Sequence, residues 1–312
     1  MRFAKVIFTS VALALIAITH AAPVDPTVPI DESLIDPPNS ESYYLADPEF
    51  ALEADEENGI LPDVNAIVQH NYDKAVKNGV KAMGLIPGIN DYSCKPSKDK
   101  PFPLVLVHGT AIILFGMDKM ENSAQELKVE IDNILEKTGA KKVDIVGYSQ
   151  GTLMPRYYQR YLGGSQKINK YAGIASIQSG TTLSGLRTLF ERLNFFEKIK
   201  EVLSPICAAC FEMEHKSDWL QMMNNDRNTE VGVNYFLVMT THDEVVTPYT
   251  NGILNATASD PGQVQMRTLQ NFCSVDMSEH ILMPYDPIVF HLVNSFLDPQ
   301  ATQSVNCWSA LK

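Results

Sequence analysis

From residue 101 onward, short apolar runs alternate with longer amphipathic stretches. Residues 101–107, 143–146, 171–177 and 233–239 are rich in Val, Ile, Leu, Tyr and Phe and have the length of buried strands. Residues 64–83, 152–162 and 288–297 instead have the spacing of helices. Strands that alternate with helices are typical of a parallel α/β sheet. The body of the chain, residues 64–312, therefore predicts an α/β domain.

The helix between the first two strands has sequence signals at both ends. Ser123-Ala-Gln-Glu126 has the pattern of a capping box, in which the Ser and Glu side chains satisfy free N–H groups at a helix start. Gly139 stands where a left-handed residue would end the helix. Between them lies the apolar face, which consists of Leu127, Ile131, Ile134 and Leu135. We therefore expect a helix that begins at Ser123 and ends before Gly139.

The first 21 residues have the layout of a signal peptide. Arg2 and Lys5 precede the apolar run 6–18, and if cleavage follows Ala21, small residues stand at positions −3 (Thr19) and −1 (Ala21). A membrane anchor is the alternative, but the run is shorter than the roughly 20 residues that span a bilayer. The prediction is a secreted, extracellular protein without a transmembrane segment, in which disulfides and a glycan on Asn255 (Asn255-Ala-Thr257) are allowed.

Charge is concentrated in residues 22–63. This segment holds twelve acidic residues and seven prolines and has no Lys or Arg, which predicts an acidic disordered tail or a propeptide. The net charge of −12 argues against a nucleic-acid partner, which would require a basic surface. Because the tail carries this charge, the body is nearly neutral, and the charge says little about a substrate.

The second strand runs into Gly147-Tyr-Ser-Gln-Gly151, which is a G-x-S-x-G motif. On a sharp strand–turn–helix elbow this motif exposes the serine hydroxyl, and the flanking glycines avoid collisions there. A serine is a weak nucleophile until a base takes its proton. The strand before the motif and the helix after it make Ser149 the candidate nucleophile.

The order serine, acid, histidine that accompanies this elbow selects the partners of Ser149. Asp243 directly follows the strand 233–239 and is the candidate acid, with Glu244 as the alternative. His280 and His291 are the histidines that follow the acid. His280 lies in a predicted loop and is preferred as the base, because His291 falls within the last helix.

An oxyanion hole requires backbone N–H groups aimed at the developing charge. Gln150, directly after the nucleophile, should supply one. The loop after the first strand, His108-Gly109-Thr110, should supply the other near Thr110. No metal or cofactor is required by this arrangement.

The chain resembles the class 2 lipase family of actinobacteria and fungi. The resemblance rests on segments spread over about residues 85–299: 103–110, 142–151, 154–158, 162–164, 207–210, 243–249, 268–270 and 278–280. It implies an α/β-hydrolase fold, hydrolysis of fatty-acid esters without a cofactor, and Ser149, Asp243 and His280 as the triad. An ester or lipid, in particular an acylglycerol at a lipid–water interface, is then the expected substrate, cleaved as a lipase or carboxylesterase.

The chain departs from the family directly after Thr110. Family members have some two dozen residues before the next strand, whereas here Ala111-Ile-Ile-Leu-Phe-Gly116 follows at once. Neighbouring parallel strands need a crossover of a dozen or more residues. We therefore expect either one bent strand or a sheet that lacks one strand and its crossover helix. A catalytically impaired or non-catalytic hydrolase-fold protein, such as a binding module or a shortened gene product, is the alternative function.

Five cysteines cannot all pair within one chain. The resemblance implies that the partner of Cys94 falls in the absent segment, which leaves Cys94 unpaired. The other four can pair as Cys207–Cys210 and Cys273–Cys307, although three connectivities are open. A redox or zinc role for Cys207-x-x-Cys210 is the weaker reading. Residues 184–210 form a candidate cap or lid, with an apolar stripe at helical spacing that ordinary core packing would also explain.

Overall fold

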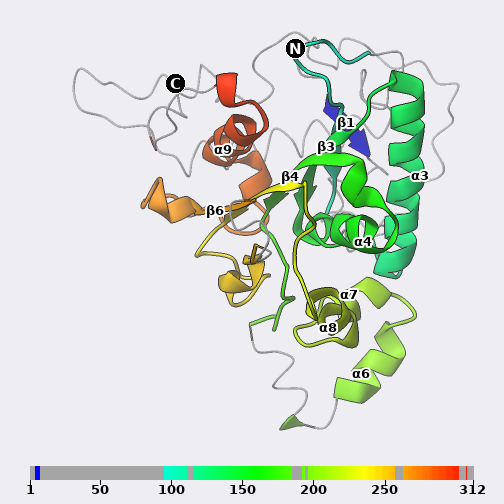
Figure 1. Cartoon of the computed structure of the whole chain (residues 1–312). Helices are drawn as coiled ribbons and strands as arrows, with labels where there is room; N and C mark the ends of the chain where they lie inside the picture. Colours follow the sequence, from blue (N-terminus) through cyan, green and yellow to red (C-terminus); the bar gives the residue numbers. More distant parts are fainter. Residues whose placement is uncertain are drawn as a thin grey trace, which may run out of the picture.

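The computed structural model describes residues 4–7, 95–110, 116–184, 192–193, 196–256, 263–301 and 307. The predicted helix 64–83, the acidic segment 22–63, Cys94 and the residues directly after Thr110 lie outside the described residues. Within them, six parallel strands pair in the order β1-β2-β3-β4-β5-β6. Figure 1 shows this sheet between α9 on one side and α3 with α4 on the other.

The elements of the body have the following bounds. The strands are β2 (Leu104–Val107), β3 (Val143–Tyr148), β4 (Ile168–Ile174), β5 (Asn234–Met239) and β6 (Val264–Thr268). The helices are α3 (Met120–Thr138), α4 (Met154–Tyr161), α6 (Phe196–Leu203), α7 (Ala208–Glu212), α8 (Asp218–Asn224) and α9 (Pro287–Leu297). The predicted α/β class and the predominantly parallel sheet are therefore confirmed.

Alternation along β5 shows how the sheet divides the core. Tyr235 and Leu237 pack into the cluster that contains α3, α4 and α8, whereas Phe236 and Val238 pack into the cluster that contains α9. Successive side chains of a strand point to opposite faces, so a strand covered on both faces reads as a continuous apolar run. This explains why residues 233–239 were recognisable as a buried strand.

The sheet position beside β2 is filled from an unexpected part of the chain. Ala4–Ile7 form β1 and pair in parallel with Leu104–Val107. These four residues lie inside the predicted signal peptide. The residues after Thr110 lie outside the described residues, so the expectation of one bent strand, or of a missing strand and crossover helix, stays a prediction, as does the cleavage of residues 1–21.

One predicted helix and one predicted strand begin three residues earlier than expected. Helix α3 begins at Met120 rather than at Ser123, because Met120 is fully buried and its N–H is accepted by the Glu212 carboxylate at 2.7 Å. A side chain from α7 therefore replaces the local capping box. Gly139 does end the helix, at φ 73°. The strand predicted at 171–177 lies at Ile168–Ile174, because the chain turns away at Ala175, which has a positive φ of 47°.

Helix α8 and the turn after it are anchored to the body by the buried Arg156 of α4. Its guanidinium donates to the Gln178 side chain at 3.0 Å, to the Asn224 side chain at 2.9 Å and to the Asn228 carbonyl at 3.2 Å. Burial lowers the pKa of Arg156. These neutral acceptors satisfy a buried cation and fix the segment that leads from β4 to β5.

Candidate active site

Ser149 stands at the turn between β3 and α4. Its φ is 53°, and a short 3-10 turn, Ser149–Thr152, follows before α4 begins. A Cβ at Gly147 would lie 2.1 Å from the Gly151 carbonyl oxygen, and a Cβ at Gly151 would lie 2.2 Å from the Val107 carbonyl oxygen. Both positions therefore require glycine. The left-handed serine is a strained conformation of the kind found at functional sites.

The loops after β5 and β6 bring Asp243 and His280 to this serine. His280 Nε2 lies 2.9 Å from Ser149 Oγ, and His280 Nδ1 lies 2.9 Å from Asp243 Oδ2 and 3.0 Å from Asp243 Oδ1. The exposed fractions of Ser149, Asp243 and His280 are 9, 8 and 4%. The imidazole can therefore accept the serine proton while the carboxylate fixes its orientation.

Asp243 is held by the start of the turn that it caps. Its Oδ1 accepts the N–H groups of Val245 at 3.0 Å and Val246 at 2.6 Å. These two hydrogen bonds fix the orientation of the carboxylate. On the other side of the imidazole ring, the Tyr148 hydroxyl donates to the His280 carbonyl at 3.0 Å. Both partners of Ser149 are thus oriented by backbone contacts.

The alternatives for the acid and the base are placed elsewhere. Glu244 is exposed, and its carboxyl is hydrogen-bonded to that of Glu279. His291 lies within α9 and is edge-on to Phe290 at 5.6 Å. Burial and the hydrogen bond with Glu244 raise the pKa of Glu279 to about 7. Asp243 and His280, expected from chain order, are thus the residues that the fold brings together. The carboxyl pair of Glu244 and Glu279 beside them was not predicted.

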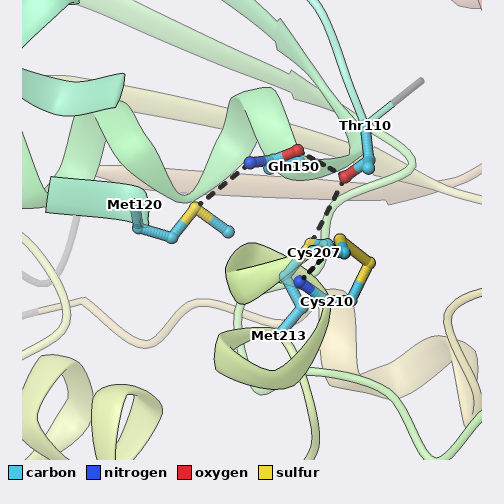
Figure 2. The surroundings of a disulfide bond; sticks show 6 residues. All are labelled: Thr110, Met120, Gln150, Cys207, Cys210 and Met213. Carbon is cyan, nitrogen blue, oxygen red and sulfur yellow. Dashed lines mark hydrogen bonds between the residues drawn. A yellow bond between two sulfur atoms is a disulfide. The ribbon is translucent and has the colours of Figure 1, made fainter. Parts of the chain in front are cut away.

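Gln150 and Thr110 form the opposite side of the site. Figure 2 shows the Thr110 hydroxyl pointing to the side-chain oxygen of Gln150, to which it donates a hydrogen bond. The Gln150 amide also contacts Met120 Sδ at 3.5 Å, and Thr110 Oγ1 contacts Met213 Sδ at 3.9 Å. Gln150 is fully buried. Its backbone N–H belongs to the first turn after the nucleophile, where helical N–H groups lack an internal partner.

Helix α7 adjoins these two residues and is closed by a disulfide (Figure 2). Cys207 and Cys210 are bonded, with their Cα atoms 5.4 Å apart. The Ala209 N–H donates to the Met117 carbonyl at 3.2 Å, and Glu212 binds the start of α3. Cys273 and Cys307 form the second disulfide. The expected pairing is therefore present, and Cys207-x-x-Cys210 serves to close a short helix.

The comparisons with known proteins agree with this geometry. A family model described as "Lipase (class 2)" matches residues 122–281. The chain belongs to the class 2 lipase family. No curated protein matches the chain. The family and the sheet topology together place the chain in the α/β-hydrolase fold.

A solved lipase structure shares the fold of this chain. Lipase B of Aspergillus fumigatus is 15% identical with a TM-score of 0.51, and the match covers 75% of this chain and 59% of that one. Lipase BlEst2 of Bacillus licheniformis in mature form is 14% identical with a TM-score of 0.48, over 65% of this chain and 94% of that one. The chain thus spans about three-fifths of the length of the Aspergillus lipase.

Gln270 supports the site of this member of the class 2 lipase family and was not predicted from the sequence. Gln270 stands in the segment 268–270 that carries part of the family resemblance, but nothing in the sequence indicated its role. Its amide bridges Thr240 Oγ1 at 2.9 Å and the Asp276 carbonyl at 3.1 Å. Among the described residues there is no group of His, Cys, Asp and Glu that could hold a metal ion. Within the same residues, none of the helices has both the length and the apolar character required to cross a membrane.

Proposed function

We propose that this class 2 lipase is a secreted serine hydrolase that cleaves carboxylic esters, in particular acylglycerols. The observation that carries the proposal is the buried His280 imidazole, which contacts Ser149 Oγ through one nitrogen and the Asp243 carboxylate through the other. This contact pattern supports a serine nucleophile, a general base and an orienting acid.

The reaction proceeds in two halves. His280 Nε2 takes the Ser149 proton as Oγ attacks the ester carbonyl, and the tetrahedral intermediate expels the alcohol, which receives that proton. Water, deprotonated by His280, then attacks the acyl-enzyme, and Ser149 leaves with the proton as the acid is released. N–H groups at Gln150 and Thr110 stabilise the oxyanion in both halves.

The described part of the 184–210 segment supports a lipid substrate. Helix α6 has no buried residue, and Val202, Leu203 and Ile206 are 67, 44 and 61% exposed. Figure 1 shows α6 at the outer end of the molecule, beyond α7. An exposed amphipathic helix next to the α7 side of the site, with apolar side chains open to solvent at its end, suits a cap that meets a lipid–water interface.

Hydrolysis of p-nitrophenyl esters of increasing acyl length tests the function. We expect Ser149→Ala to reduce kcat by at least about 10³-fold and to abolish labelling by a fluorophosphonate probe. A wild-type protein that is no faster than Ser149→Ala, and that does not take up the probe, would identify the chain as a non-catalytic member of the fold. Activity on emulsified triacylglycerol above that on dissolved short esters would establish the lipid preference.

Secretion and glycosylation have their own test. Asn255 is exposed, as a glycan acceptor must be. We expect the secreted protein to lack residues 1–21 and to lose mass on treatment with an N-glycosidase. Mass spectrometry of the secreted chain from a eukaryotic host, with Asn255→Gln as the control, measures both. An intact N-terminus would contradict the leader prediction.

A further inference from the structure

Two buried carboxyl groups lie next to the loop that carries His280. Asp276 is fully buried, and Asp286 is 1% exposed. Oδ1 of Asp286 caps α9 by accepting the N–H groups of Ile288 at 2.7 Å and Val289 at 3.4 Å. Oδ1 of Asp276 accepts the Ser278 N–H at 2.8 Å. Each carboxyl therefore has one oxygen bound by backbone donors.

The remaining oxygens require a different partner. Three buried oxygens here have no hydrogen-bond partner: Oδ2 of Asp276, Oδ2 of Asp286 and Oγ of Ser278. The three side chains adjoin, since Asp276 raises the pKa of Asp286 and Ser278 lowers it. Two carboxylate oxygens in contact repel each other unless a proton lies between them, because only a protonated carboxyl can donate.

Burial and the neighbouring charge act in the same direction. They raise the pKa of Asp286 well above the ordinary range of an aspartic acid, burial being the larger cause and Asp276 the next. A protonated Asp286 carboxyl can donate a hydrogen bond to the Asp276 carboxylate. The Ser278 hydroxyl can donate to the same pair.

The pair is connected to both partners of Ser149 through Thr240. The Thr240 hydroxyl donates to the Ser278 carbonyl at 2.8 Å and accepts the His242 N–H at 3.2 Å. Gln270 completes this network, since its amide donates to Thr240 Oγ1 and the Asp276 carbonyl, and its oxygen accepts the Thr241 N–H at 2.9 Å. The loop 276–280 and the turn that bears Asp243 are thereby joined.

We propose that Asp276 and Asp286 share one proton and act as a positioning pair, which fixes the His280 loop to the start of α9 and, through Thr240, to the turn of Asp243. The proposal deepens the proposed function, on which its kinetic part rests. Neither aspartate contacts the reacting atoms, so their effect is on the placement of the imidazole relative to Ser149.

The pH dependence has a definite sign. The folded protein keeps a proton that unfolded aspartates release above about pH 4, so stability falls as pH rises from there until the pair ionises. Other titratable groups near the loop are Glu279 and His280 on the loop itself, Glu244 and Asp243 opposite it, Tyr285 and Tyr148, and His291 on α9. Glu279, which titrates at about 7, is the neighbour whose effect must be separated.

Isosteric amides separate a shared proton from an ordinary ion pair. In Asp286→Asn or Asp276→Asn, the side-chain NH₂ donates permanently to the remaining carboxylate. We expect either variant to retain kcat within about threefold near neutral pH and to lose the decline in stability toward alkaline pH. Asp276→Ala, which leaves Asp286 buried without its partner, should lower kcat about tenfold or more with little change in KM, because the imidazole is displaced.

The controls address neighbouring charges. Glu279→Gln removes one carboxyl of the partly exposed Glu244–Glu279 pair. Asp144→Asn removes a carboxylate near the start of β3 that accepts hydrogen bonds from the Asn169 side chain and the Lys170 N–H. Neither should remove the alkaline decline attributed to Asp276 and Asp286. Urea-unfolding midpoints between pH 4 and 9 and kcat over the same range are the measurements.

Infrared spectroscopy decides the shared proton independently of catalysis. Because Glu279 is itself partly protonated near pH 7, the spectra are recorded in the Glu279→Gln background. There we expect a protonated carboxyl band at neutral pH that disappears when Asp276 or Asp286 is also changed to Asn. Absence of this band from Glu279→Gln alone, or Asn variants as impaired as Asp276→Ala, would overturn the proposal. If Ser149 proves non-catalytic, the band and the stability profiles still report on the pair, so the two failures are distinguishable.

Discussion

The two sides of the Ser149 site are built from different materials. On the acid–base side, Asp243 and His280 are held by directional hydrogen bonds from Val245, Val246 and Tyr148. On the proposed oxyanion side, Gln150 contacts the sulfur of Met120 and Thr110 that of Met213, beside a disulfide-closed helix. Thioether contacts are weak and adaptable, whereas buried hydrogen bonds are specific in angle. We therefore expect substitutions on the acid–base side to cause large losses of kcat and substitutions on the other side to cause smaller ones.

The largest effect is expected for the acid. Asp243→Asn keeps the shape of the side chain but removes the charge that orients His280, so we expect kcat to fall by about 10³- to 10⁴-fold. Stopped assays with an activated ester measure this loss. Glu244→Gln, the neighbouring carboxyl, should change kcat less than threefold. A similar loss in both variants would mean that the acid has been misassigned.

On the oxyanion side, Thr110→Ala should lower kcat only about tenfold. The variant keeps the backbone N–H but removes the hydroxyl that holds the Gln150 side chain, so the hole loses support rather than a donor. Thr110→Ser, which restores the hydroxyl, should recover most of the activity. Burst kinetics locate the change in the acylation step, and a loss as large as that of Asp243→Asn would remove the contrast between the two sides.

Removing the disulfides should have smaller effects, one mainly on kcat and the other mainly on Tm. Cys207→Ala with Cys210→Ala opens α7 beside Thr110, and we expect kcat to fall about three- to fivefold with a minor change in Tm, because a bridge across a sequence separation of 3 constrains the unfolded chain little. Cys273→Ala with Cys307→Ala spans a separation of 34 and should lower Tm more while changing kcat less. Thermal unfolding and steady-state rates distinguish the two variants.

The smallest effect concerns the outer carboxyl pair. The raised pKa of Glu279, about 7, means that the folded state binds a proton that the unfolded chain releases, so stability falls as pH rises toward and through 7. Glu279→Gln should reduce the fall in Tm between pH 5 and 8, leaving the part attributed to Asp276 and Asp286, and by removing a charge near His280 should change the pH profile of kcat/KM. An unchanged profile would show that this pair does not act on the imidazole.

The elements that could be predicted are those whose signal is local. The strand 233–239 is apolar on both faces, and Gly139 can end α3 in the left-handed region, so both were found from their own residues. Met120 begins α3 because Glu212, 92 residues away, accepts its N–H. No pattern within one segment contains that information, and the local capping box was misleading for this reason.

The same distinction applies to the site. Ser149, Asp243 and His280 were selected because chain order and strand ends restrict where such residues can stand. Gln270, Thr240 and Asp286 act through contacts between segments, and their residue types are common in ordinary turns and helix caps. Strand β6 was also missed, since its side chains alternate between half-buried and exposed and form no apolar run.

The elbow around Ser149 places two kinds of constraint within five residues. Gly147 and Gly151 are required by folding, since any side chain there would collide with backbone, whereas the hydroxyl of Ser149 is required only by the proposed chemistry. A saturation scan scored by the amount of folded protein should therefore exclude substitutions at 147 and 151 but permit several at 149. Scored by ester turnover, the same scan should exclude all three. The difference between the two scores at residue 149 measures how far the family motif has been retained for its reaction rather than for its fold.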